Sequence, residues 1–291
     1  MDFSYTVCEK GIEITKYLKD EAVAEVPAEI DGKAVISIGK YAFEGKRELI
    51  EVVLPDGMVT IGAHAFYNCR KLTKIHLSDC IISTEDGAFK NCRSLRYVFV
   101  KVILYKMTFL KNLLSELNQE IHVTMDYEKE GQTSKLVFPS YLHDYVDNVE
   151  ARIINQVTYG SGVHYRECMQ EKSVDFNKYD KTFYIAKIND SEDTLLAIVL
   201  YRLEYPYELS MDARNEYKAY IKEHFLQIIE LCVEKEDVDA LMILAKHGFY
   251  TEDSIDSAIQ VAHRREKIAC TGVLLDYKKS HFSVRKKTFD L

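Results

Sequence analysis

Apolar residues recur with a period of 23 residues through most of the first hundred positions of the chain. The clearest marker is an Ala-Phe pair, which stands at Ala42-Phe43, Ala65-Phe66 and Ala88-Phe89. Leucine, isoleucine and valine recur in step with it, as Leu49-Val52-Leu54, Leu72-Ile75-Leu77 and Leu95-Val98-Val100. A fixed period of roughly 20–29 residues predicts a solenoid, in which each repeat forms one coil and stacks on its neighbours.

The second repeat indicates which side of a coil each residue occupies. Ile75 and Leu77 follow the pattern of a short strand whose apolar side chains face inward, so Lys74 and His76 face outward on the concave side. The segment 62–66 predicts the convex side. Its glycine permits a tight bend there, and its phenylalanine fills the interior between coils.

The bends carry small or polar residues at equivalent positions. Asn68 and Asn91 are placed where their amides can bond to unpaired backbone, and Gly45 holds that place in the first repeat. The third repeat has Thr84-Glu85 where Ile-Gly is expected. We therefore expect the third coil to bend differently from the first two.

One repeat resembles a known family in detail. The run from Ile61 to Leu77 reads Ile-Gly-Ala-His-Ala-Phe-Tyr-Asn-Cys-Arg-Lys-Leu-Thr-Lys-Ile-His-Leu. It is similar to the signature of BspA-type leucine-rich repeats, Ile-Gly-x-x-Ala-Phe-x-x-Cys-x-x-Leu-x-x-Ile-x-Leu-Pro, and the likeness covers about residues 10–101. The resemblance implies a leucine-rich-repeat protein of a bacterium. Many relatives are long, secreted and adhesin-like, so a surface adhesin fragment is one role that the resemblance implies.

The segments on either side of the repeats follow other patterns. Two β-rich runs joined around Gly11, residues 3–7 and 12–17, predict a hairpin that caps the first coil. After the repeats, residues 104–117 have helical spacing and residues 121–125 resemble a short strand. The polar run 128–134 predicts a surface loop.

Helical patterns dominate from about residue 140 onward. The clearest helices are predicted at 193–203, 215–233 and 237–248, the last ending in a glycine cap, with Thr251 as the N-cap of the next helix. Residues 257–262, Ser-Ala-Ile-Gln-Val-Ala, stand where ankyrin repeats carry Thr-Pro-Leu-His-x-Ala. This stretch resembles degenerate ankyrin-type repeats, and a plain array of helical hairpins explains the same letters.

These patterns together predict an α+β chain. It consists of a short leucine-rich-repeat solenoid with three 23-residue repeats and an N-terminal β cap, followed by a mostly helical, ankyrin-like repeat region. The expected divisions are the cap at 1–35, the BspA-type repeats at 36–103, a mixed and mostly helical connecting region at 104–207, ankyrin-like hairpins at 208–281 and a tail at 282–291.

Charge and cysteine usage narrow the class of protein. A formal net charge of −8 argues against a protein that coats nucleic acid, which needs a basic face. No apolar run approaches the roughly 18 residues of a membrane span, and the N-terminus lacks the features of a secretion signal. Seven cysteines without a Cys-x-x-Cys favour reduced thiols. We expect a cytoplasmic protein that binds neither nucleic acid nor membrane.

Two cysteines hold the same place in neighbouring repeats. Cys69 and Cys92 are 23 residues apart and should lie on adjacent coils. Their position predicts a ladder of small buried thiols, with a disulfide between the coils as the alternative.

The outward residues of the predicted strands give the candidate binding site. They form two rows on the concave face, Glu51, Lys74 and Tyr97 in one and Val53, His76 and Phe99 in the other. Both rows become aromatic at their C-terminal end, as binding patches often are. The alternative is that the following segment, which is itself apolar, covers Tyr97 and Phe99.

A second candidate site lies outside the repeats. The sequence Gly-Ser-Gly-Val-His-Tyr-Arg at 160–166 places Ser161, His164 and Arg166 beside flexible glycines, which could cradle a phosphate. It matches no known phosphate loop, and a structural loop explains it equally well. His164 and Cys168 at i, i+4 spacing give neither a complete metal site nor a catalytic dyad with an orienting group. We expect no metal and no cofactor.

The sequence therefore favours a non-enzymatic scaffold for protein–protein interaction. One alternative is a ligand-binding or enzymatic domain at 135–210, centred on Ser161, His164 and Arg166 and targeted by the repeats. A third is the surface adhesin fragment.

Overall fold

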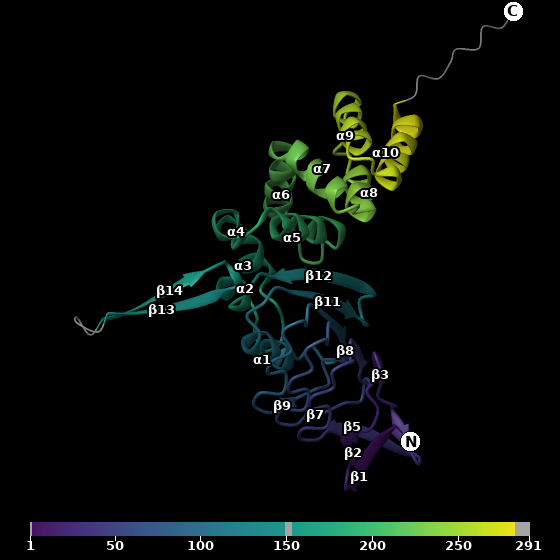
Figure 1. Ribbon diagram of the computed structural model, residues 1–291, viewed down its shortest axis with the longest axis vertical. Coiled ribbons are helices and arrows are strands. Elements are labelled where there is room, and N and C mark those ends of the chain that lie inside the picture. Colours follow the sequence, from purple (N-terminus) through teal and green to yellow (C-terminus); the bar gives the residue numbers. More distant parts are fainter. Residues whose placement is uncertain (1, 149–152, 283–291) are drawn as a thin grey trace, which may run out of the picture. The chain divides into compact units, whose positions relative to one another are not determined.

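A computed structural model describes residues 2–148 and 153–282 (Figure 1). The chain divides into two compact units. The first comprises the residues up to Asp190 together with Tyr205–Leu209, and the second comprises Ser191–Glu204 and the residues from Ser210 onward. From residue 283 on, the expected tail lies outside the described residues.

The first unit contains a β-solenoid of about five coils built on two sheets. One sheet has the order β1 (Phe3–Cys8), β2 (Gly11–Tyr17), β5 (Lys33–Ile38), β7 (Thr60–Ile61) and β9 (Ser83–Thr84), and β4 (Glu29–Ile30) pairs with β5. The other, which we call the long sheet, has the order β12 (Gln132–Phe138), β11 (Ile121–Tyr127), β10 (Tyr97–Val102), β8 (Lys74–Ser78), β6 (Glu51–Val53) and β3 (Val23–Glu25). Neighbours in the long sheet are parallel except for the antiparallel pair β11 and β12. The predicted hairpin around Gly11 is confirmed by the antiparallel pair β1 and β2.

The repeated phenylalanines form a stack through the interior of the coils, as predicted. Phe43, Phe66 and Phe89 are fully buried. The ring centroids of Phe43 and Phe66 are 4.8 Å apart, and those of Phe66 and Phe89 are 5.1 Å apart. Tyr17 extends this stack at one end and Phe109 at the other, at 5.1 and 6.4 Å. We call these five rings the aromatic ladder.

The two repeat cysteines form the predicted ladder of buried thiols. The Cys69 thiol donates to the carbonyl of Phe43 at 3.0 Å, and the Cys92 thiol donates to the carbonyl of Phe66 at 3.1 Å. Both cysteines are free and buried. Burial raises the pKa of Cys69 to about 12 and also raises the pKa of Cys92.

The backbone conformation at the bends explains why one repeat position holds either glycine or asparagine. Gly45, Asn68 and Asn91 have φ angles of 67°, 62° and 67°, in the left-handed region that glycine adopts freely and asparagine adopts more readily than most other residues. The Asn91 amide donates to the side-chain oxygen of Asn68 at 3.0 Å. The expected partner of these amides was backbone, so that expectation is wrong: the two side chains bond to each other.

The third coil keeps the register of the others, so the different bend expected at Thr84-Glu85 is wrong. Thr84 pairs in parallel with Ile61 of the preceding coil. The Glu85 carboxylate accepts a hydrogen bond from the Ala63 N–H at 2.9 Å. Polar residues thus replace Ile-Gly here without interrupting the stack.

The solenoid continues past residue 103, where the repeats were expected to end. Helix α1 (Thr108–Glu116) takes the place of a convex segment, and β11 then returns to the long sheet in parallel with β10. Tyr97 stays 41% exposed, so the expectation that the following segment covers it is wrong. The reason is that β11 lies beside β10 within the sheet.

Strands also occupy segments that were expected to be loop or helix. The hairpin of β11 and β12 includes residues 132–134, which were expected in a loop. A second hairpin, β13 (Leu142–Asn148) and β14 (Ile153–Tyr159), was not predicted, since neither glycine nor proline marks a turn within it. The Tyr179 hydroxyl donates to the Val137 carbonyl at 2.8 Å and accepts from the Val137 N–H at 2.9 Å, which closes the outer edge of β12.

Short helices complete the first unit. They are α2 (Gly162–Arg166), α3 (Phe176–Lys181) and α4 (Phe183–Asn189). The segment 205–209 belongs to this unit because Tyr207 stacks on Tyr127, with ring centroids 4.0 Å apart, and meets Phe176 at 5.3 Å.

The second unit is helical. Its described helices are α5 (Glu192–Glu204), α6 (Met211–Glu223), α7 (Phe225–Glu234), α8 (Val238–Lys246), α9 (Glu252–Arg264) and α10 (Ile268–His281). Helix α7 packs on α9 and α8 packs on α10, as in stacked helical hairpins. Leu244 and Leu274 are both buried at equivalent positions of α8 and α10.

Two details of these helices test the predicted boundaries. The single helix expected at 215–233 is wrong: His224, with φ −106° and ψ 21°, separates α6 from α7 without a proline or glycine. The predicted caps are confirmed, with Gly248 at φ 70° and Thr251 in a reciprocal capping box with Ser254. Within residues 2–148 and 153–282, no helix combines the length and apolarity of a membrane span.

Candidate binding face of the long sheet

The six residues predicted for the concave rows lie on one face of the long sheet. Glu51, Lys74 and Tyr97 are in register across β6, β8 and β10, and so are Val53, His76 and Phe99. Side chains alternate along a strand, so these residues lie opposite the buried face formed by Val52, Ile75 and Val98. We call this side the outer face of the long sheet.

Glu51 organises the centre of the outer face. Its carboxylate oxygens lie 2.8 Å from His76 Nε2 and 3.6 Å from Lys74 Nζ. The His76 ring lies flat on Phe99, with centroids 4.4 Å apart and 7° between the planes. The carboxylate and the phenyl ring therefore hold the imidazole in one orientation.

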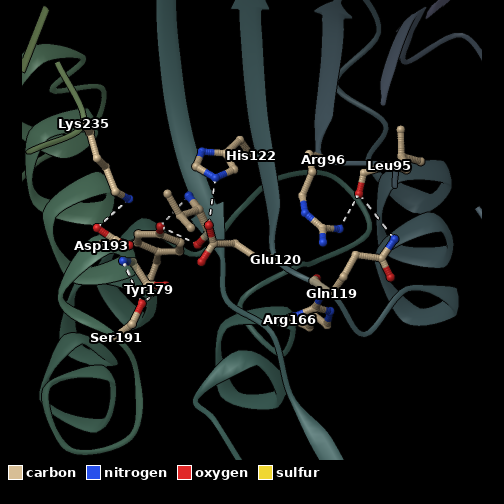
Figure 2. Close-up of polar contacts among 12 residues, drawn as sticks. Leu95, Arg96, Gln119, Glu120, His122, Arg166, Tyr179, Ser191, Asp193 and Lys235 are labelled. Carbon is tan, nitrogen blue, oxygen red and sulfur yellow. Dashed lines mark hydrogen bonds and ion pairs between the residues drawn. The ribbon is translucent and has the colours of Figure 1, made fainter. Parts of the chain in front are cut away.

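Strand β11 carries both rows one strand further. His122 is in register with Tyr97, and Thr124 with Phe99. His122 Nε2 lies 3.0 Å from Glu120 Oε1, and a dashed line marks this contact in Figure 2. The His122 and Tyr97 ring centroids are 5.3 Å apart. Four rings from three adjacent strands thus gather on the outer face: His76, Phe99, Tyr97 and His122.

The sequence interpretation missed His122, Glu120 and Thr124. The signal that could have found them is the alternation of Ile121, Val123 and Met125, which are all fully buried. Val123 pairs with Val98, a spacing of 25 residues where the two preceding strand pairs have 23. Helix α1 lengthens this coil, so β11 lies outside the 23-residue period of the repeats.

Tyr97 is the ring of this cluster that is most open to a partner. Its residue is 41% exposed, whereas the His122 side chain is 15% exposed. In the part of the chain that the structure describes, the Tyr97 hydroxyl has no hydrogen-bond partner. An amphipathic ring with an unused hydroxyl suits a contact surface.

The residues of the second candidate site, Ser161, His164 and Arg166, do not line a common pocket. Ser161 is buried, and its N–H and hydroxyl both donate to the carboxylate of Asp190, the N–H at 3.1 Å. His164 is exposed on α2. It borders a hollow of about 410 Å³ that neither Ser161 nor Arg166 lines.

Arg166, which is labelled in Figure 2, bonds to backbone carbonyl oxygens through its guanidinium. Its guanidinium donates to the carbonyl oxygens of Leu114, Leu117, Gln119, Pro139 and Gly162. Burial lowers the pKa of Arg166 to about 10, so the group stays charged at neutral pH and holds three segments together. This geometry indicates a structural role.

Cys168 was considered together with His164 as a catalytic or metal-binding residue. Burial raises the pKa of Cys168 to about 11, which keeps the thiol protonated at neutral pH and unsuited to nucleophilic attack. Among the described residues there is no group of three or more His, Cys, Asp or Glu that could hold a metal ion.

Comparison with protein families identifies the repeats. Residues 28–124 match the family described as BspA type leucine rich repeat region, in six copies. This part of the chain is therefore a BspA-type repeat region, and the resemblance read from residues 61–77 is confirmed. The family model counts six copies where the Ala-Phe pair occurs three times.

Similar solved structures are also leucine-rich-repeat proteins. One from T. pallidum is 32% identical over 37% of this chain and 53% of its own, with a TM-score of 0.33. One from Bacteroides capillosus is 26% identical over 34% of this chain and 77% of its own, with a TM-score of 0.32. A leucine rich cell surface protein from Faecalibacterium prausnitzii is 23% identical over 34% and 35%, with a TM-score of 0.30. The chain spans about half the length of the T. pallidum protein, and no curated protein matches it.

Proposed function

We propose that this chain is a non-enzymatic scaffold that binds a protein partner through the outer face of the long sheet. The observation that carries the proposal is the ring cluster of His76, Phe99, Tyr97 and His122, which is ordered in advance and keeps Tyr97 exposed. The BspA-type repeats support it, since leucine-rich-repeat proteins are generally binding scaffolds.

The chemistry of the outer face defines the partner surface that would fit. Aromatic rings supply contact area with little loss of side-chain entropy, and tyrosine is enriched among the residues that dominate binding energy. Glu51 and Glu120 flank the rings, and a carboxylate is a hydrogen-bond acceptor. We expect a partner that places an apolar side chain over Tyr97 and amide or basic donors toward these carboxylates.

The alternative of a catalytic or ligand-binding domain at 135–210 gains no support from the geometry. Ser161 and Arg166 use their polar groups inside the protein, and His164 stands apart from both. A scaffold requires no such site.

We also propose a reducing, cytoplasmic location in preference to an adhesin role. All seven cysteines are described and free, and five of them are buried. Free thiols are typical of reducing compartments. Cell fractionation with an antibody against the chain tests this location, and recovery from the outer surface of intact cells would contradict it.

A matched pair of variants tests the binding face. The wild-type chain and its Tyr97→Ala/Phe99→Ala double variant are used to capture partners from a lysate of the source cells. We expect a partner that wild type retains and that the double variant binds about tenfold or more weakly, as truncating a dominant contact does. Tyr41→Ala is the control, because Tyr41 is 40% exposed and lies outside the outer face. A partner retained equally by wild type and the double variant would exclude this face.

A further inference from the structure

Backbone hydrogen bonds link the convex bends of successive coils, and this row of bonds ends at the third coil. The Gly45 N–H donates to the Tyr67 carbonyl on the next coil at 2.8 Å, and the Asn68 N–H donates to the Lys90 carbonyl at 3.1 Å. The equivalent residue of the third coil is Asn91. Among the residues that the structure describes, none accepts a hydrogen bond from the Asn91 N–H.

The position of Phe66 and Phe89 shows which group can replace the carbonyl of a further convex segment. The Phe66 N–H donates to the Ala88 carbonyl at 2.8 Å. The equivalent Phe89 N–H donates instead to the Glu116 carboxylate of α1, at 3.1 Å. A carboxylate oxygen therefore takes the place of the carbonyl that a further coil would supply. Helix α1 serves this position and leaves the one at Asn91 open.

The open N–H lies beside a hollow of about 370 Å³. Lys90, Asn91 and Arg93 line it from the bend, and Glu116 and Gln119 line it from the segment that includes the end of α1. The Gln119 side chain donates to the carbonyls of Cys92 at 3.0 Å and Leu95 at 3.3 Å, the second of which Figure 2 shows. These bonds fix the wall of the hollow against the third coil. The Asn68 N–H points from its coil to the next, so the Asn91 N–H points away from the second coil, toward this side.

The charges around the hollow favour a singly charged anion. Lys90 and Arg93 are exposed, and neither forms an ion pair with any residue in the described part of the chain. Hydrogen bonds between an N–H and an anion flanked by cations are stronger than neutral ones. Asp86 and Glu116 also line the hollow, so its two cations and two carboxylates balance formally. The two carboxylates repel a dianion such as phosphate more strongly than a singly charged anion.

We propose that this hollow binds a carboxylate, which accepts a hydrogen bond from the Asn91 N–H and pairs with Lys90 and Arg93. The carboxylate of Glu116 on the adjacent position shows that this group fits between the bend and α1. The ligand is a free small carboxylic acid or an acidic side chain of a peptide. The site is separate from the outer face of the long sheet and does not depend on the function proposed for it.

Amide hydrogen exchange of the full chain tests the open position. The Asn68 N–H is paired and the Asn91 N–H is not, so we expect Asn91 to exchange on the order of tenfold or more faster. Equal protection of the two amides would show that Asn91 already has an acceptor and would overturn the proposal.

An NMR titration of the deuterated, ¹⁵N-labelled chain tests the ligand. The probes are sodium acetate, the peptide acetyl-Ala-Glu-Ala-amide and its Gln counterpart. We expect a saturable downfield shift of the Asn91 amide proton with acetate or the Glu peptide, and none with the Gln peptide. Tighter binding of the Glu peptide than of acetate assigns the ligand to a peptide, and equal binding assigns it to a small acid.

Arg93→Gln should weaken the response by roughly threefold or more, since it removes one of the two cations. Arg70→Gln is the matched control, because Arg70 is the exposed residue at the equivalent position one coil earlier, away from the hollow. The proposal fails if Asn91 responds to no carboxylate, if the Gln peptide shifts it equally, or if Arg70→Gln weakens the response as much as Arg93→Gln.

Discussion

Buried residues of the solenoid are stabilised by copies of themselves one coil away. Phe66 stacks between Phe43 and Phe89, and Cys69 and Cys92 donate to carbonyls at equivalent positions of the preceding coils. Because each buried side chain meets both neighbouring coils, a single substitution disturbs two interfaces. The 23-residue period made these contacts predictable residue by residue.

The buried Cys69 thiol should make the stability of the solenoid depend on alkaline pH. Burial raises the pKa of Cys69 to about 12, whereas the pKa of a thiol in an unfolded chain is about 8.5. The folded state keeps its proton while the unfolded state loses it. This contribution to the free energy of unfolding is therefore complete below about pH 8.5 and is lost as the pH rises toward about 12.

Urea unfolding between pH 8 and 10.5 measures this dependence. We expect Cys69→Ala to flatten the decline of the unfolding free energy by up to about 1.4 kcal/mol per pH unit, the limit for one proton. Cys8→Ala, at an exposed position, should leave the slope unchanged. Identical slopes for wild type and Cys69→Ala would contradict the assignment.

At the scale of elements, the sequence predicted those whose signals are local. Helix α1 follows from its apolar spacing, and the Thr251 cap follows from its side chain. The break at His224 and the hairpin of β13 and β14 have no glycine or proline to mark them. Both depend on tertiary context, which single-sequence patterns do not contain.

The bend at Asn68 separates two local effects that a substitution can distinguish. Asn68 has φ 62° and accepts a hydrogen bond from Asn91. Asn68→Gly and Asn68→Ala both remove that bond, but only alanine adds the steric cost of a Cβ in the left-handed region. We expect alanine to be more destabilising than glycine by about 1 kcal/mol, measured by urea unfolding. Equal losses would mean that the amide bond, and not the backbone conformation, selects asparagine here.

At the scale of the whole molecule, periodicity predicts what a regular stack brings together. The two rows of the outer face could be predicted from the sequence, because the register of β6, β8 and β10 follows the repeat. The role of Arg166 could not, because most of its carbonyl partners lie 27 to 52 residues away in the sequence. The continuation into β11 was hidden by the longer coil that contains α1.

The two units have separate cores, so we expect a substitution in one core to accelerate hydrogen exchange in that unit. Phe66 lies in the aromatic ladder of the first unit, and Leu244 is fully buried in the helical array of the second. Removing a buried Phe or Leu side chain costs about 2–5 kcal/mol. We expect Phe66→Ala to accelerate hydrogen exchange in peptides from the repeat region, and Leu244→Ala to do so in peptides from α7 to α10.

Hydrogen exchange monitored by mass spectrometry on the full chain makes this comparison, with Tyr41→Ala as an exposed control. Each core variant should leave the other unit at wild-type exchange rates, because the side chain it removes packs only within its own core. Acceleration in both units by either variant would show that the chain unfolds as one cooperative body. The outer face could then not be assigned a stability of its own, and binding defects in Tyr97 and Phe99 variants would have to be compared at equal global stability.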